Sequence, residues 1–349
     1  MSCPEPGPPR PVTFVVGTGR SGSTAVTQIL HAHPDVLSLN ELLAVIHGRA
    51  FGPDPVDGAQ FWRVLADPQP VFNSMIRSGV AMPELLYHRK PGRFTAEQGI
   101  PAICLMPLPA LSEDPDSLFD ELAAEVAGWP GRYLPEHWMA LFDWLCRRFG
   151  RQVVVERSGF SLGAIPALRV AFPHARFVHL YRRGPDCALS MSRHTGYRLI
   201  MLMTQMAAQV GVAGIEELRP EHQALLPPDL APLLGDVYDP ALVLDRAMDL
   251  ADFGALWSRL VTEGQQLLAQ LPGAVRMDLQ YESLLADPAG ELTRLADFAG
   301  FSADPRWLAA GGAALDPGRR GATSRLDAAQ RQALESACAP GMRALGLAG

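Results

Sequence analysis

Lysine is almost absent from this 349-residue chain: Lys90 is the only one, so 29 of the 30 basic residues are arginines. Cysteine is also scarce. The five cysteines are scattered, odd in number and without a C-x-x-C pair, which excludes a disulfide framework and a cysteine-based zinc site. This usage predicts a protein of the reducing cytoplasm.

Long hydrophobic runs are missing as well. The most apolar stretch near the middle, residues 199–214, is interrupted by Gln205 and Gln209 and is shorter than the ~20 apolar residues that a bilayer span needs. The start, MSCPEPGPPRP, has neither a basic region nor an apolar core, so residues 1–11 are predicted to be a disordered lead-in, not a signal peptide. We expect no transmembrane segment.

The chain also lacks an excess of positive charge, since 37 acidic residues against 30 basic ones give a net charge of −7. This balance argues against a nucleic-acid partner. The charge is unevenly placed, because residues 151–198 hold eight arginines against Glu156 and Asp186, which makes that stretch +6 (8 − 2). The pattern indicates a local site for an anion.

Short β-branched runs alternate with helical patterns, as in a parallel α/β sheet of the Rossmann-like kind. Strands are predicted at 12–16, 36–39, 152–155, 176–181 and 274–279, and helices at 24–33, 161–172, from 185, and 289–300. Two long helix-and-loop stretches, about 48–150 and 199–272, are expected to form a helical cap over the ligand crevice. Residues 12–349 are therefore predicted to form one domain.

The strongest local motif is Gly-Thr-Gly-Arg-Ser-Gly-Ser-Thr at residues 17–24, between a predicted strand and a predicted helix. Such a turn directs backbone N–H groups and the positive end of a helix at one point, which suits a phosphate. The spacing imitates the nucleotide-binding pattern G-x-x-x-x-G-K-[ST], but Ser23 stands where lysine belongs and Arg20 is the loop's only cation. The candidate phosphate-binding residues are Gly19, Arg20, Ser21, Gly22, Ser23 and Thr24.

This loop, followed by HAHPDV, resembles the 5′-phosphosulfate loop of sulfotransferases that use 3′-phosphoadenosine 5′-phosphosulfate (PAPS), in the branch that includes tyrosylprotein and many bacterial sulfotransferases. The resemblance implies a sulfotransferase, or P-loop-NTPase-like, fold and PAPS as cofactor, with 3′,5′-adenosine diphosphate (PAP) as product and no metal. Residues 176–194, RFVHLYRRGPDCALSMSRH, resemble the family's 3′-phosphate segment. Arg182 and Ser190 occupy its two phosphate-binding positions.

Three further segments resemble parts of the same family. VVVERSGFSL resembles its E-K-T-P segment, with Arg157 in place of the lysine that touches the transferring sulfuryl group. Tyr281 in MDLQYESLLADP lies where a tyrosine approaches the nucleotide or serves the core. DPGRRGATSRL resembles the loop that closes over the 3′-phosphate, and its candidate contacts are Arg319, Arg320 and Arg325.

A base is needed to accept the proton of the acceptor hydroxyl. In the tyrosylprotein branch this base is a glutamate 21 residues after the loop arginine, and Glu41 stands at that distance from Arg20. A helix-start glutamate after an Asn40 N-cap is the competing interpretation. His47 is the alternative base. Arg20 and Arg157 are the cations expected to stabilise the leaving phosphate.

The sequence therefore predicts transfer of a sulfuryl group from PAPS to a hydroxyl of a small molecule, such as an alcohol, phenol, lipid or sugar. Two alternatives remain open. One is a P-loop small-molecule kinase with a degenerate loop, and the other is a nucleotide-binding relative without turnover. The sequence holds no metal-site motif, and it does not indicate an oligomeric state.

Overall fold

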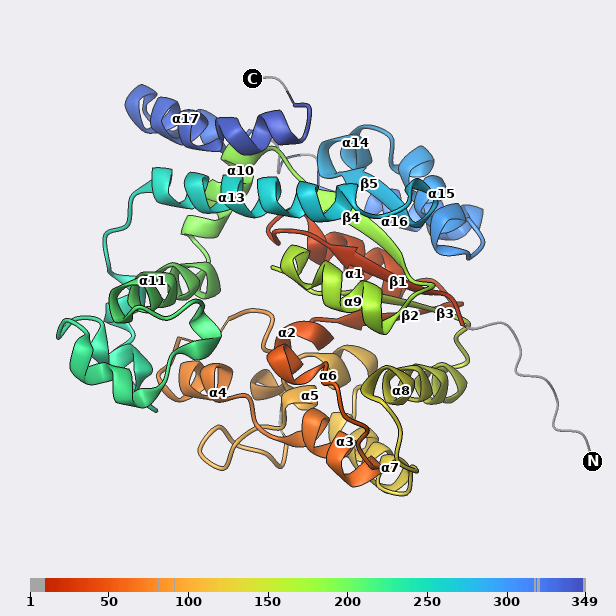
Figure 1. Cartoon of the computed structure of the whole chain (residues 1–349). Coiled ribbons are helices and arrows are strands. Elements are labelled where there is room, and N and C mark those ends of the chain that lie inside the picture. Colours follow the sequence, from red (N-terminus) through yellow and green to blue (C-terminus); the bar gives the residue numbers. More distant parts are fainter. Residues whose placement is uncertain (1–9, 81, 91, 317, 319–320, 348–349) are drawn as a thin grey trace, which may run out of the picture.

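A five-stranded parallel sheet forms the centre of the protein in the computed structural model, which describes residues 10–80, 82–90, 92–316, 318 and 321–347. The strand order is β2-β3-β1-β4-β5 (Figure 1). The strands are β1 Val12–Val16, β2 Val36–Asn40, β3 Val153–Arg157, β4 Arg176–Tyr181 and β5 Arg276–Gln280. Since all neighbouring pairs are parallel, all strands end at the same edge.

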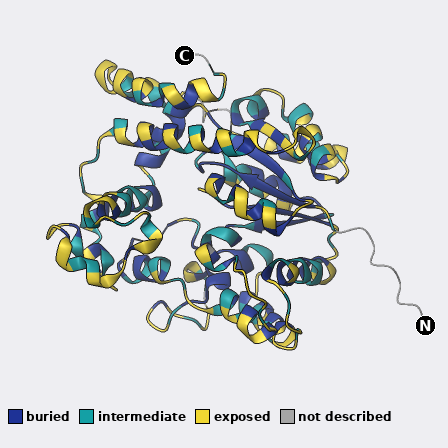
Figure 2. Ribbon diagram, viewed as in Figure 1, coloured by how far each residue is buried: buried dark blue, intermediate teal, exposed yellow. Residues whose placement is uncertain are grey.

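Both faces of the sheet are covered, which explains why its central strands are near-continuous apolar runs. Alternate residues face opposite sides: Phe14 and Val154 belong to one hydrophobic cluster and Val15 and Val155 to the other. Figure 2 shows the central strands as buried segments between helical layers. This alternation decides the direction of every side chain at the strand ends.

The first cluster packs the sheet against α9 (Ile165–Ala171) and the helices between β2 and β3, which include α2 (Leu42–Ile46) and α8 (Leu134–Phe149). The second packs it against α1 and α14–α16, and a third joins α10, α13 and α17. The helices that accompany the strands are α1 Ser23–His31, α2 Leu42–Ile46, α9 Ile165–Ala171, α10 Gly184–Ser192, α14 Tyr281–Ala286, α15 Pro288–Ala299, α16 Pro305–Ala313 and α17 Ala328–Ala344.

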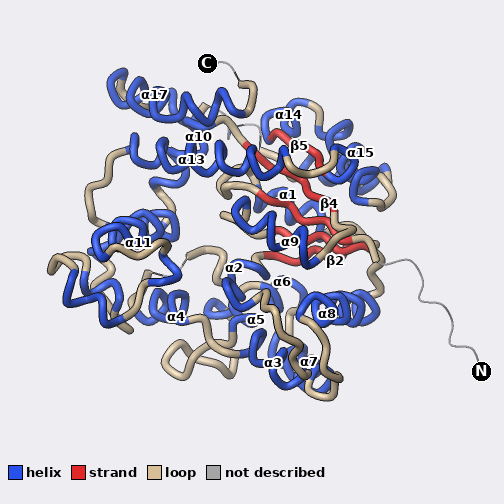
Figure 3. The backbone as a smooth tube through the Cα atoms, viewed as in Figure 1, coloured by secondary structure: helices blue, strands red, loops and turns tan. Residues whose placement is uncertain are grey.

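Two helical insertions flank the sheet (Figure 3). The first, between β2 and β3, lies below the sheet in Figure 1 and holds α3 Gly58–Ala66, α4 Pro70–Arg77, α5 Ala102–Leu105, α6 Pro107–Leu111, α7 Pro115–Val126 and α8 Leu134–Phe149. The second holds α11 Thr195–Val210, α12 Ala241–Leu244 and α13 Leu250–Ala269. No helix within the described residues is both long and apolar enough to cross a membrane.

The predicted α/β class and parallel sheet are confirmed, and the differences lie at element boundaries. The third strand extends to residue 157, so Arg157 is part of β3. In place of one helix over 161–172, the structure has a 3₁₀ turn, Leu162–Ala164, followed by α9. Pro166 lies in the first turn of α9, where the fixed φ of proline favours the start of a helix. The last strand begins at Arg276 because residues 273–275 form a 3₁₀ turn. Most of the predicted lead-in, residues 1–9, lies outside the described residues.

Candidate functional site

The loop between β1 and α1 has the geometry of an anion site. Gly22 is the N-cap of α1 with φ of 87°, contributes no capping side chain, and is followed by a first turn without acidic residues. The first N–H groups of a helix have no intrahelical acceptor and carry the positive end of its dipole. A nine-residue helix that starts in this way can receive a phosphate at its N-terminus.

Two tyrosines from distant elements lie in close contact with the glycines of this loop. A Cβ on Gly22 would collide with the ring of Tyr281, and a Cβ on Gly19 would collide with the hydroxyl of Tyr197. Tyr197, on α11, donates its hydroxyl to the carbonyl of Thr18, and burial raises its pKa. Tyr281, predicted to lie near the nucleotide or in the core, is buried and lies against Gly22. Tyr197 was not predicted, because nothing local in the sequence marks it.

Backbone strain is concentrated at the same place. Three non-glycine residues in the described chain have positive φ: Arg20 (57°), Glu41 (56°) and Phe160 (56°). Each such conformation costs about 1–3 kcal/mol and persists only where the surroundings enforce it. Glu41 follows β2 at a bend and α2 begins one residue later, so the helix-start interpretation with Asn40 as N-cap is wrong: Asn40 is the last residue of the strand.

Arg20 joins the loop to the second motif. Its Nε donates to the Ser190 hydroxyl at 3.2 Å, although 170 residues separate them in the sequence. Its Nη1 also pairs at 3.1 Å with Glu84 of the first insertion, and Glu84 in turn contacts Nε2 of His194 at 3.2 Å. Burial opposes ionisation of Glu84, but the hydrogen bond and charge of His194 and the charge of Arg20 lower its pKa to about 2.

Arg182 lies at the end of β4, beside the late loop. Its guanidinium carbon stands 5.6 Å from the centre of the Tyr281 ring, and its Nη2 is 3.6 Å from Asp186. Asp186 also accepts the backbone N–H groups of Gly321 (3.0 Å) and Thr323 (3.2 Å). Of the predicted late-loop arginines, Arg325 is exposed, and Arg319 and Arg320 lie outside the described residues.

Glu41 and Arg157 form a buried ion pair. Because Arg157 has the orientation of Val155, its side chain reaches toward α1, where Nε donates to the Thr27 hydroxyl at 2.8 Å. The other carboxylate oxygen of Glu41 accepts the N–H of Gly159 at 2.9 Å. Gly159 packs against Gly19, so a Cβ placed on either glycine would lie 3.6–3.8 Å from the other's Cα. The predicted base, cation and loop are therefore brought together.

The remaining predicted residues divide into three groups. The Ser21 hydroxyl is buried and donates to the Leu180 carbonyl at 3.1 Å, which holds the loop onto β4. Ser23 is half-buried and Thr24 is exposed at the start of α1. His47 begins a 3₁₀ turn after α2, and its side chain is outside what the structure describes.

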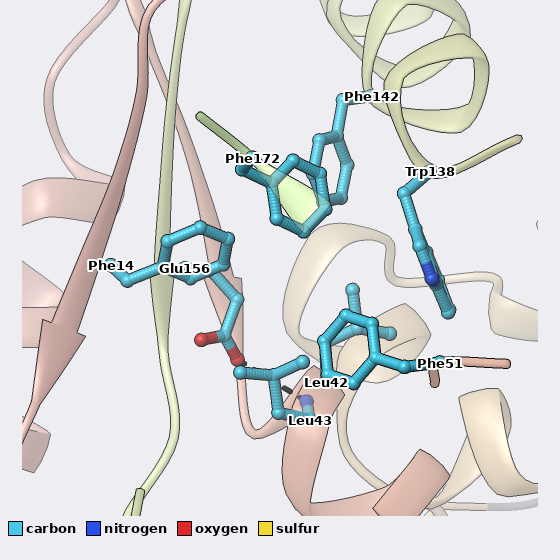
Figure 4. Close-up of a pocket in the computed structure, with 8 residues that line it drawn as sticks. All are labelled: Phe14, Leu42, Leu43, Phe51, Trp138, Phe142, Glu156 and Phe172. Carbon is cyan, nitrogen blue, oxygen red and sulfur yellow. Dashed lines mark hydrogen bonds between the residues drawn. The ribbon is translucent and has the colours of Figure 1, made fainter. Parts of the chain in front are cut away.

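Glu156 is a further ionisable residue that the motif comparison did not single out. It points to the face opposite Arg157 and lies beside a small cavity whose other residues are apolar (Figure 4). Burial raises its pKa to about 7, against the hydrogen bonds that it accepts from Ser158 and Leu43. The sequence could have indicated this position, because a glutamate in line with the buried valines of a central strand faces the interior.

The arrangement suits a ligand with two anionic groups. The N-terminus of α1 with Arg20 can hold one, and Arg182 with Ser190 can hold the other. Arg157 is buried, and its guanidinium is bonded to Glu41, Asn40 and Thr27. The contact between Arg20 and Ser190 brings a side chain of the loop and a side chain of the second motif together. Within the described residues, no group of three or more His, Cys, Asp or Glu side chains is placed to hold a metal ion.

One segment of the chain matches a known protein family in sequence. Residues 11–76 match the model of a family described as the sulfotransferase family; this segment contains the loop and Glu41. A search of curated proteins found no match.

Several solved structures resemble the chain weakly. They include a sulfotransferase domain from the curacin biosynthetic pathway (13% identity, 94% of this chain and 97% of that one, TM-score 0.46). A sulfotransferase from Alicyclobacillus acidocaldarius is 16% identical over 96% and 94% of the two chains, with a TM-score of 0.38. Sulfotransferase STF1 from Mycobacterium tuberculosis H37Rv is 16% identical over 95% and 76%, with a TM-score of 0.41. At TM-scores below 0.5 these likenesses assign no function to individual residues.

Proposed function

Because the chain belongs to the sulfotransferase family through its residues 11–76, we propose that it transfers a sulfuryl group from PAPS to a hydroxyl of a small molecule. The observation that carries the proposal is the contact between Arg20 and Ser190. It joins the predicted 5′-phosphosulfate loop to the predicted 3′-phosphate segment, and only a ligand with anionic groups at both ends uses both. In this proposal residues 12–349 form one domain.

In this proposal PAPS supplies the sulfuryl group, and the protein residues bind, orient and accept a proton. Glu41 accepts the proton of the acceptor hydroxyl as its oxygen attacks sulfur and the bond from sulfur to the phosphate oxygen breaks. Arg157 and Gly159 each hold one oxygen of Glu41, and a carboxylate retains further lone pairs for the incoming proton. This fixed orientation is what a general base requires.

The cations of the site stabilise the charge that develops on the leaving 5′-phosphate. Arg20 and the N-terminal N–H groups of α1 face a charge that grows as the bond breaks, so their contribution is larger in the transition state than in the ground state. Arg157 holds a permanent charge and cannot act as a general acid at neutral pH. The leaving phosphate is therefore stabilised by charge and hydrogen bonds, without a proton from this residue.

The acceptor is proposed to be a small molecule with an apolar portion. Phe160, 38% exposed, directly follows the glycine that holds Glu41. It lines a cleft with Leu162 and Leu260 beside the start of the phosphate loop. An exposed aromatic ring next to the proposed base favours an alcohol or phenol over a highly charged acceptor. A cytoplasmic location remains a prediction of the sequence.

Equilibrium binding tests the cofactor. We expect PAP to bind more tightly than ATP by titration calorimetry, with no need for Mg²⁺. Ser190→Ala should weaken PAP binding but leave AMP binding unchanged, because AMP lacks the 3′-phosphate. Ser192→Ala is the matched control, since its hydroxyl donates to the carbonyl of Leu189 within the same helix at 2.9 Å. Preference for ATP with Mg²⁺ would instead establish the kinase alternative.

Turnover tests the base and the acceptor. Incubation with labelled PAPS and a small-molecule extract of the source organism should yield a labelled sulfate ester. Glu41→Gln should reduce the rate by about 10²–10⁴, the usual contribution of a general base, while PAP binding persists. A Glu41→Gln protein with full activity would exclude Glu41 as the base, and PAP binding without any transfer would favour the non-catalytic alternative.

A further inference from the structure

Glu156 is linked to the segment that carries the proposed base, although the mechanism above does not use it. It lies on β3 beside Phe14 of β1 and is 1% exposed. Phe142, Trp138 and Phe172 surround the small cavity beside it (Figure 4). A carboxyl group at such a position is costly unless hydrogen bonds require it there.

The hydrogen bonds of Glu156 lead to the turn that follows Glu41. Its Oε1 accepts the N–H of Leu43 at 3.3 Å, drawn as a dashed line in Figure 4, and the hydroxyl of Ser158 at 2.6 Å. The Ser158 oxygen in turn accepts the N–H of Ala44 at 3.3 Å. These two N–H groups belong to the first turn of α2, which has no intrahelical acceptor for them.

Residues 40–44, here called the Glu41 bend, therefore rest on residues 156–159 through a series of contacts. The N–H of Glu41 donates to the Arg157 carbonyl at 2.8 Å, and the Glu41 side chain contacts Arg157 and Gly159. The strained φ of Glu41 needs such enforcement. Glu156 and Ser158 hold the part of the bend that begins α2, because they accept the N–H groups of Leu43 and Ala44.

We propose that Glu156 is a positioning residue for Glu41: by accepting the Leu43 N–H and orienting Ser158 toward Ala44, it fixes the Glu41 bend against β3. This inference rests on the proposed function, since it takes Glu41 as the base. Glu156 is 1% exposed and faces an otherwise apolar cavity, so its removal should lower kcat and leave the affinity for PAP unchanged.

Three variants of the full chain separate positioning from bulk stability. Glu156→Leu removes the acceptor oxygen from a site of similar size, whereas Glu156→Gln retains an oxygen for the Leu43 N–H. Phe142→Leu is the matched control, because it enlarges the same cavity from α8 without a hydrogen bond to the bend. Hydrogen exchange, read on peptides covering residues 40–46, reports the bend without any acceptor.

We expect exchange in residues 40–46 to quicken at least tenfold in Glu156→Leu, with wild-type exchange in Glu156→Gln and Phe142→Leu. With PAPS and 2-naphthol as probe substrates, kcat should fall at least tenfold in Glu156→Leu, and the Kd for PAP should stay within twofold. In Glu156→Gln, which keeps the acceptor oxygen, kcat should return to the wild-type value.

Two results would overturn the inference. One is equal loss in Glu156→Leu and Phe142→Leu, which would make Glu156 an ordinary core residue. The other is unchanged exchange at residues 40–46 in Glu156→Leu. If the wild-type protein binds no PAP and transfers no sulfuryl group, the proposed function fails, whereas the exchange experiment still decides whether Glu156 holds the bend.

Discussion

Glu84→Gln is the most informative single substitution for the anion site. Glu84 pairs at 3.1 Å with Arg20, the only cation of the phosphate loop. A bound 5′-phosphosulfate would compete with this carboxylate for the same guanidinium. Removing the carboxylate charge should therefore strengthen PAP binding, although Glu84 belongs to a different part of the chain.

The magnitude follows from the burial of the pair. The side chains of Arg20 and Glu84 are 27% and 22% exposed, so the pair lies between an exposed ion pair, about 0.2–1 kcal/mol, and a buried charge-assisted hydrogen bond, about 1.5–3 kcal/mol. A value of about 1 kcal/mol is appropriate. Since about 1.4 kcal/mol corresponds to a factor of ten, the Kd for PAP should fall about fivefold.

Titration calorimetry with PAP at constant ionic strength measures this change. Glu97→Gln is the control, because Glu97 is an exposed residue of the same insertion and the substitution changes the net charge equally. An unchanged or weaker affinity in Glu84→Gln would refute the competition between Glu84 and the ligand. An equal gain in both variants would show that only the overall charge matters.

Three other predictions concern stability and the loop. Arg157→Met should lower the free energy of unfolding by about 3–5 kcal/mol in urea denaturation, because it leaves the buried Glu41 without its partner; the double variant with Glu41→Gln should recover part of the loss, and no recovery would contradict the coupling. Burial raises the pKa of Glu156 from 4.5 to about 7, so the folded protein binds more protons than the unfolded chain between these values. This group should therefore lower stability by up to about 3 kcal/mol as pH rises from 4.5 to 7, an effect that should be absent from the pH profile of Glu156→Gln. Gly22→Ala should abolish PAP binding, since its Cβ would displace Tyr281, whereas Gly79→Ala, with similar φ and open space around it, should bind PAP normally.

Much of the fold follows from local sequence patterns. The runs at 12–16 and 176–181 became strands with the predicted bounds. Each is a β-rich apolar run followed by a turn and a helix, so neighbouring residues contain the information. Boundaries set by competing turns were less predictable, as at Leu162–Ala164, where a 3₁₀ turn replaced the start of the expected helix.

The candidate site was predictable where one motif carries it. The loop glycines, Arg20 and Glu41 lie within one strand-turn-helix-strand unit, and the structure places them together. Glu84 and Tyr197 were not predicted, because neither belongs to a motif. Each reaches the loop from an insertion, across 64 and 179 residues of sequence respectively.

The sequence by itself determined that every cation of the candidate site is an arginine, since Lys90 is the only lysine and lies outside every motif. It also determined the parallel α/β class, through the alternation of apolar runs and helical patterns. Only the tertiary structure decided which partner each charge has: Arg157 holds Glu41, Arg20 holds Glu84 and Ser190, and Glu156 faces the core. The physical reason is that secondary structure depends on neighbours in the chain, whereas an ion pair depends on how the sheet faces and insertions pack.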